Sequence, residues 1–101
     1  MNINHLKRFL SAFNSNKTVR LRTLAGDTAW RKIKQTDPEK LEFFPFTHED
    51  IRARQISLFS TAKEMEKLGL VEHVYKRGEN FFRKVFQEPR NPEQYLKEVF
   101  V

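Results

Sequence analysis

The chain has 101 residues, of which 39% are hydrophobic, and it contains ten Phe, one Trp, three Gly and four Pro. This length suits one domain with one core, and the apolar content excludes an intrinsically disordered chain. Cysteine is absent, which excludes disulfides and thiolate metal sites and favours a reducing, cytoplasmic location. The formal net charge of +6 raises the expectation of a polyanionic partner such as nucleic acid.

The basic residues are concentrated in the first part of the chain. Residues 1–40 hold nine Lys or Arg against three Asp or Glu, whereas residues 41–75 hold four against six and residues 76–101 hold six against four. Near the N-terminus, Lys7 and Arg8 interrupt the apolar positions, so this segment lacks the continuous apolar stretch of a signal peptide or a membrane span. We therefore expect no membrane association.

A first helix of about ten residues is predicted near the N-terminus, with Asn4 as its capping residue and the segment 14–16, Asn-Ser-Asn, as its end. One face of this helix carries apolar residues at positions i, i+3, i+4 and i+7, namely Leu6, Phe9, Leu10 and Phe13. Residues 17–23 then alternate polar and apolar side chains, which predicts a short, half-exposed strand with Arg20 and Arg22 on its outer face.

A second helix is predicted after Gly26, with Asp27 as its N-cap and with Trp30 and Ile33 facing inward. Its outward side chains extend a basic surface that comprises Arg20, Arg22, Arg31, Lys32 and Lys34. Such a surface is as consistent with a generic solvated face as with a track that binds phosphates.

Two further helix starts lie in the middle of the chain. The segment 36–39, Thr-Asp-Pro-Glu, predicts a short helix that ends before Pro45. Thr47, with an acid three residues later, forms the pattern of a capping box. In the stretch 49–68 that follows, apolar residues recur mainly every third position, and Gly69 supplies the left-handed stop. This pattern leaves open whether the stretch is one long helix or two shorter ones.

The last third of the chain predicts a hairpin and a final helix. Residues 71–76 and 81–86 are β-prone runs joined by the turn 77–80, Arg-Gly-Glu-Asn. Residues 91–101 begin with Asn-Pro-Glu-Gln, which predicts a C-terminal helix. Its apolar end can close a homodimer or cover the core.

The stretch 56–72, ISLFSTAKEMEKLGLVE, resembles the recognition-helix end of winged helix-turn-helix proteins. In that superfamily a helix that starts with Ser and Thr leads through spaced apolar residues to a Leu-Gly-Leu-Val-type exit, and a β-hairpin wing follows. The resemblance covers residues 48–86 well and residues 3–23 loosely, and it indicates no specific family within the superfamily.

The resemblance implies an α+β fold with a small antiparallel sheet, as a single domain over residues 1–101. Within it, residues 24–47 are an insertion or extra helices. A shorter helix at residues 51–55 and a turn near 55–58 would precede the recognition helix.

The function implied by the resemblance is binding of duplex DNA by a small bacterial, phage or plasmid transcription regulator. A recognition helix that starts near Phe59 would enter the major groove, and a basic wing would contact the backbone or the minor groove. The nucleic-acid-binding residues would be Arg52, Arg54, Ser57, Ser60, Thr61, Lys63, Lys67, Lys76, Arg77, Arg83 and Lys84. Because Glu64 and Glu66 leave this helix nearly neutral, a protein-protein interaction module, such as an adapter or an inhibitor of a nucleic-acid machine, is the alternative.

Other chemistries are disfavoured. The three histidines lie on separate elements without metal-ligand spacing, so we expect neither a metal nor another cofactor. Ser60 and Thr61 lack a glycine-flanked elbow and a matched base, so we expect no enzymatic activity. The adjacent Phe pairs at 43–44 and 81–82 could stack on unpaired bases of RNA or single-stranded DNA, but in a small domain such pairs more often split between core and rim.

Overall fold

The computed structural model describes residues 2–85, so the C-terminal helix predicted at 91–101 and its homodimer contact lie outside the described residues. The elements follow in the order α1 (Ile3–Phe13), β1 (Thr18–Arg20), α2 (Leu21–Ala25), α3 (Asp27–Thr36), η1 (Pro38–Phe43), α4 (His48–Lys67), β2 (Val71–Lys76) and β3 (Glu79–Lys84). The fold is α+β, as predicted, with an antiparallel sheet in the order β1-β3-β2.

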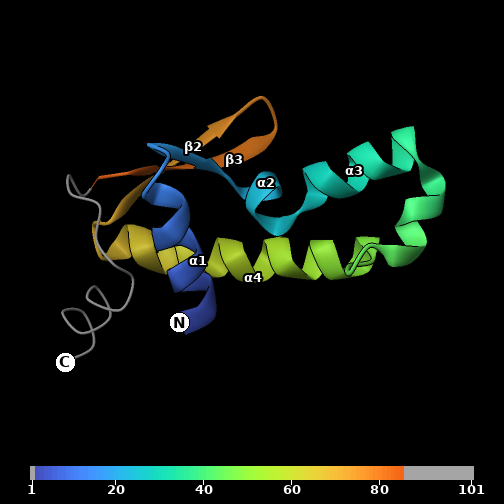
Figure 1. Ribbon diagram of the computed structural model, residues 1–101. Coiled ribbons are helices and arrows are strands. Elements are labelled where there is room, and N and C mark those ends of the chain that lie inside the picture. Colours follow the sequence, from blue (N-terminus) through green and yellow to red (C-terminus); the bar gives the residue numbers. More distant parts are fainter. Residues whose placement is uncertain (1, 86–101) are drawn as a thin grey trace.

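The described chain divides into two parts (Figure 1). The body consists of residues 3–25 and 56–84, which contain α1, α2, the sheet and the C-terminal half of α4. The arm consists of residues 27–55, in which α3 and η1 run out from the body and the N-terminal half of α4 runs back. A single helix, α4, therefore belongs to both parts.

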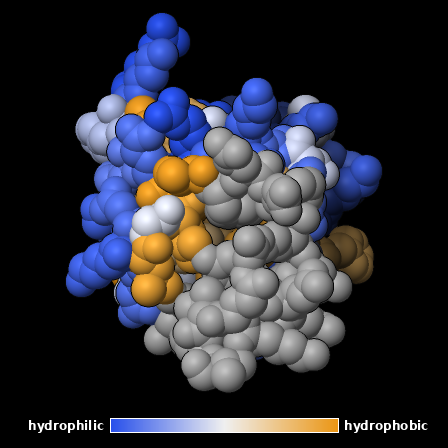
Figure 2. Space-filling model, turned by 90° about the vertical axis from the view of Figure 1, so that its left-hand side faces the viewer, coloured by the Kyte–Doolittle hydropathy of each residue, from blue (hydrophilic) through white to orange (hydrophobic). Residues whose placement is uncertain are grey.

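The body encloses the apolar core. The four apolar residues predicted on one face of the first helix are all buried: Leu6, Phe9, Leu10 and Phe13. Leu58 and Met65 of α4 join them, and Phe82 of β3 contacts Phe9 edge-on with ring centroids 6.0 Å apart. The end of the body opposite the arm shows hydrophobic surface (Figure 2). Leu68, at the C-terminal end of α4, and Val85, which follows β3, are each 52% exposed.

Two predicted helix starts are corrected by the structure. The side chain of Asn2, not Asn4, caps α1 by accepting the backbone N–H of His5 at 3.1 Å. At α3 the N-cap is Gly26, whose φ of 92° lies in the left-handed region. Asp27 is the first helical residue, because its carboxylate binds arginines instead of capping the helix.

The strand predicted over residues 17–23 is shorter than expected. β1 ends at Arg20, where its pairing with β3 stops, and Leu21 begins the short helix α2. Leu21 and Ala25 are buried on the inner side of α2. Tertiary packing of these two apolar residues therefore overrides the alternating pattern that indicated a longer strand.

α4 is one unbroken helix of 20 residues, so the shorter helix predicted at 51–55 and the turn near 55–58 are wrong. Residues 48–67 contain neither Gly nor Pro, and Ile51 and Leu58, seven positions apart, are buried on the same face. The capping box predicted from Thr47 is confirmed, since its side chain and that of Asp50 each accept the other residue's backbone N–H. Neither α4 nor any shorter helix in residues 2–85 has the length and apolar content needed to cross a membrane.

Residues 24–47 form extra helices. η1 is a 3₁₀ helix that begins at Pro38 and ends before Pro45, as the sequence predicts. The neighbouring Phe residues split between surface and core, because Phe43 is 84% exposed while Phe44 packs against the core. Phe44 also meets Phe46 edge-on, which anchors the loop that leads into α4.

The predicted hairpin is confirmed, with a tighter turn than expected. Arg77 and Gly78 form a two-residue turn in which both residues have positive φ, 54° and 75°, the pattern of a type I′ turn. Lys76 consequently pairs with Glu79, and β3 starts two residues earlier than the run 81–86 suggests. This register places Glu79 on β3, where it reaches β1 and α2.

Candidate nucleic-acid interface

Arg22 lies at the centre of an ion-pair network where the body meets the arm. Its Nε lies 3.0 Å from Oδ2 of Asp27, and its Nη1 donates to Oε1 of Glu79 at 3.0 Å. Arg31 Nε lies 3.3 Å from the same Asp27 oxygen, and Arg20 pairs with Glu79 Oε2. The network thus fixes five side chains from β1, α2, α3 and β3 relative to one another.

Both carboxylates of this network are paired with guanidinium groups. Asp27 is 3% exposed and is the one charged residue that is buried among residues 2–85. A buried carboxylate is tolerated when charged hydrogen-bond donors surround it, as Arg22 and Arg31 do here. Hydrogen bonds from Arg20 and then Arg22 outweigh desolvation and hold the pKa of Glu79 below its usual value. Both acids therefore position arginines.

Three adjoining depressions run from this network along the arm, and Arg31 lines all three. We call the combined feature the basic groove. Six cationic side chains line it: Arg20, Arg22, Arg31, Lys32, Lys34 and Arg52. The carboxylates in its lining are Asp27 and Glu79, so the groove has an excess of positive charge.

The structure thus brings the whole predicted basic surface together with Arg52, a residue assigned by sequence to the helix-turn-helix. Arg54, two positions further along α4, faces another side, where its guanidinium carbon lies 4.1 Å from the centroid of the Phe46 ring. Ser57 faces α1 and shares a hydrogen bond of 3.0 Å with Nδ1 of His5. Burial and the positive charge of Arg54 lower the pKa of His5. Neither Arg54 nor Ser57 lines the basic groove.

The prediction that Thr61 contacts nucleic acid is wrong. Thr61 is 2% exposed, because it lies on the face of α4 that also buries Leu58 and Met65. Ser60 and Lys67 are exposed on the outer side of α4. Lys63, which is half-buried, pairs with Glu66 at 2.7 Å, as expected for a solvated helix face.

The basic wing residues separate into two groups. Lys76 and Arg77 are exposed at the hairpin turn, next to Glu79, so they flank one end of the basic groove. Arg83 and Lys84 lie at the opposite end of β3. There, Arg83 pairs with Glu72, and Lys84 Nζ donates to the backbone carbonyl of Phe13 at 3.3 Å.

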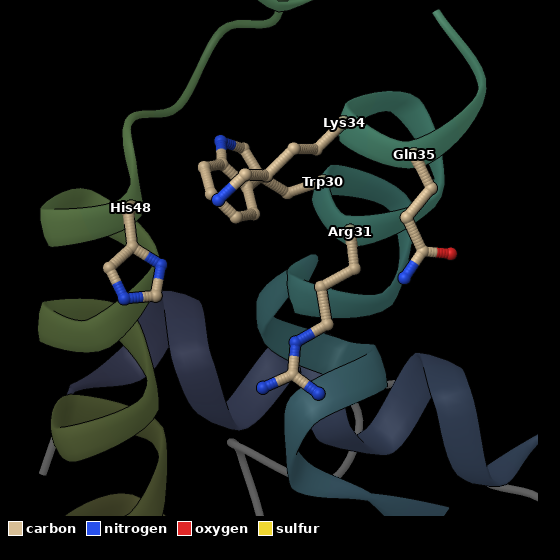
Figure 3. Close-up of a pocket in the computed structure, with 5 residues that line it drawn as sticks. All are labelled: Trp30, Arg31, Lys34, Gln35 and His48. Atoms are coloured by element: carbon tan, nitrogen blue, oxygen red, sulfur yellow. The ribbon is translucent and has the colours of Figure 1, made fainter. Parts of the chain in front are cut away.

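The arm end of the basic groove carries residues to which the sequence assigned no binding role. Trp30 and Gln35 of α3 and His48 of α4 line it with Arg31 and Lys34 (Figure 3). Trp30 is half-buried and not turned wholly inward as predicted. A local sequence pattern could not show that these residues share a site, because η1 separates α3 from the start of α4 along the chain.

Within residues 2–85, no group of three or more His, Cys, Asp or Glu side chains is arranged to hold a metal ion. No protein-family model, curated protein or solved structure matches the chain. The function is therefore inferred from the chemistry of the basic groove.

Proposed function

We propose that the protein binds duplex DNA, with the sugar-phosphate backbone lying along the basic groove. The observation that carries this proposal is the convergence of six cationic side chains from four elements on one groove whose carboxylates are already paired. Neutralising phosphates with Lys and Arg releases condensed counterions and supplies most of the affinity of non-specific DNA binding.

The cations of the groove contribute in two ways. Arg20, Arg22 and Arg31 are held in place by Asp27 and Glu79, so little side-chain entropy is lost when their remaining N–H groups donate to phosphate oxygens. The other three make no ion pair within residues 2–85 and keep their full charge for a ligand: Lys32, Lys34 and Arg52.

A winged helix-turn-helix architecture supports the same function. The resemblance implies the order helix, strand, helix, helix and hairpin, and in residues 3–84 a helix and a strand come first and the hairpin last, with α2, α3, η1 and α4 between them. In this assignment α4 is the recognition helix, and the hairpin is the wing, whose Lys76 and Arg77 contact the backbone of the same duplex. Under this proposal the protein is a small cytoplasmic transcription regulator that acts by occupying DNA.

The test is a titration of fluorescently labelled duplex DNA by anisotropy at several salt concentrations. The six cations and two carboxylates of the groove leave a net charge of +4, so the slope of log K against log salt should be on the order of −4. The double variant Lys32→Ala/Lys34→Ala should weaken binding by about fivefold or more and make the slope shallower by about 2.

The matched control is Lys7→Ala/Lys17→Ala, which removes the same charge outside the basic groove. It should leave the slope within about half a unit of the unmodified protein. If the control and the groove variant weaken binding equally, the contact is not in the groove. If the unmodified protein does not bind at low salt, duplex binding itself is wrong.

A protein-interaction module is the second candidate, and an apolar cleft beside the hairpin favours it. Leu21, Ile56 and Phe59 line this cleft together with Gln55 and Asn80. Ile56 is 68% exposed, so this cleft presents apolar surface that a partner protein could bury. Binding of a protein there would respond weakly to salt, whereas binding of DNA in the basic groove responds steeply.

A further inference from the structure

The arm end of the basic groove differs from the rest because it contains an aromatic pair. The ring centroids of Trp30 and His48 lie 5.0 Å apart, with the ring planes at 40°. Lys34 Nζ lies 5.0 Å from the centroid of the Trp30 ring. Figure 3 shows the indole between α3 and α4, with Lys34 crossing its face and the Arg31 side chain extending away from it.

This cleft has the size and the chemical groups to bind one nucleotide. Its volume of about 550 Å³ lies within the range of small-molecule sites. An indole can stack on any nucleobase, and Lys34 and Arg31 supply donors for a phosphate. Gln35 offers both amide donors and an acceptor, which suit the edge of a base.

A base inside a duplex cannot use such a cleft, since its neighbours in the stack cover both of its faces. The base must be unpaired and unstacked, as in a single strand. The cations at the other end of the groove, Arg20 and Lys32, lie beside the wing and need only a phosphate backbone. One groove thus joins a site for a base to a track for phosphates.

We infer that the arm end of the basic groove binds an unpaired nucleotide and that the protein prefers a junction of duplex and single-stranded DNA to continuous duplex. This inference rests on the proposed function, because the remainder of the groove has to hold the duplex. Lys34 makes no ion pair within residues 2–85, so its ammonium group can move from the indole to the phosphate of the bound nucleotide.

Trp30 is the single tryptophan of the chain, so intrinsic tryptophan fluorescence reports directly on this cleft. The full-length protein is titrated with a blunt duplex, with the same duplex carrying a short single-stranded tail, and with the tail alone. Tailed duplex should quench the fluorescence and should bind about fivefold or more tighter than blunt duplex, as expected for one base stacked on an aromatic ring.

Two variants separate stacking from folding. Trp30→Leu keeps apolar bulk but cannot stack, so the ratio of its affinities for tailed and blunt duplex should fall to about one. Trp30→Phe keeps an aromatic face and should retain most of the preference. Both variants are measured with labelled DNA, after circular dichroism has shown that they fold.

The possible outcomes distinguish the two proposals. Equal affinity for tailed and blunt duplex, with unchanged tryptophan fluorescence, overturns the junction preference and leaves duplex binding standing. Tail alone binding as tightly as tailed duplex also overturns it, since the duplex part then contributes nothing. Absence of binding to all three ligands overturns the proposed function itself.

Discussion

The body and the arm are stabilised by different interactions. Of the residues that form the buried apolar core, all except Ile51 belong to the body. In the arm, the buried residue of α3 is Asp27, and η1 has none. Partly buried aromatic rings and paired charges therefore place the arm. This difference shows how a small domain can extend a basic groove beyond its core, because the arm that carries Arg31, Lys32, Lys34 and Arg52 contributes little to that core.

The largest expected effect contrasts two Phe residues. Phe82 in the body is fully buried beside the rings of Phe9 and Phe59, whereas Phe44 in the arm is partly exposed. Phe82→Ala should lower the free energy of unfolding by about 3–5 kcal/mol, because it leaves a cavity in the core. Phe44→Ala should lower it by about 1 kcal/mol. Urea unfolding followed by far-UV circular dichroism measures both, and equal losses would contradict the contrast.

A smaller effect is expected at the junction of the two parts. Asp27→Asn removes the charge that binds Arg22 and Arg31, while the partly exposed arginines regain water. The free energy of unfolding should fall by about 1–2 kcal/mol, a value reduced for the solvent exposure of both arginines. Asp37→Asn is the matched control, since Asp37 pairs with Lys40 at 3.8 Å on the surface. The free energy of unfolding of Asp37→Asn should fall by no more than about 0.5 kcal/mol. A loss from Asp27→Asn no larger than the control's would show that the network does not tie the arm to the body.

The smallest effect concerns the first turn of α4, in the arm. Thr47→Ala removes the oxygen that accepts the Asp50 N–H at 3.1 Å, and it should cost about 1 kcal/mol. Native-state hydrogen exchange should show faster exchange at the Asp50 amide and unchanged exchange in β3. Thr47→Ser keeps the hydroxyl and should restore the slower rate. If all amides speed up equally in Thr47→Ala, the arm does not open separately from the body.

The sequence predicted the parts of the fold that depend on local pattern. Apolar spacing located the core face of α1, and the turn signal at Gly78 located the hairpin. The continuity of α4 was left open, because a three-residue apolar step fits one helix as well as two. α2 was missed, since its burial of Leu21 and Ala25 depends on packing against α4 and β3.

The candidate site was predicted residue by residue but not as one site. The basic side chains on β1, α2 and α3 were recognised, yet their convergence depends on Glu79, which lies 57 positions from Arg22 in the chain. No periodicity links residues so far apart. Thr61 was misplaced because the local composition was misleading. Its Ser/Thr-rich segment indicated an exposed surface, whereas its position along the continuous helix α4 turns the side chain inward.

The unbroken α4 has a mechanical consequence for the groove. A helix of 20 residues is about 30 Å long, and without Gly or Pro it has no point about which the arm can bend. The wall that α4 provides is therefore rigid with respect to the body. The opposite wall, α3, is joined to the body through Gly26, whose left-handed backbone separates α2 from α3. A rotation of α3 about Gly26 would change the width of the groove, and it would act against the ion pair between Arg22 and Asp27.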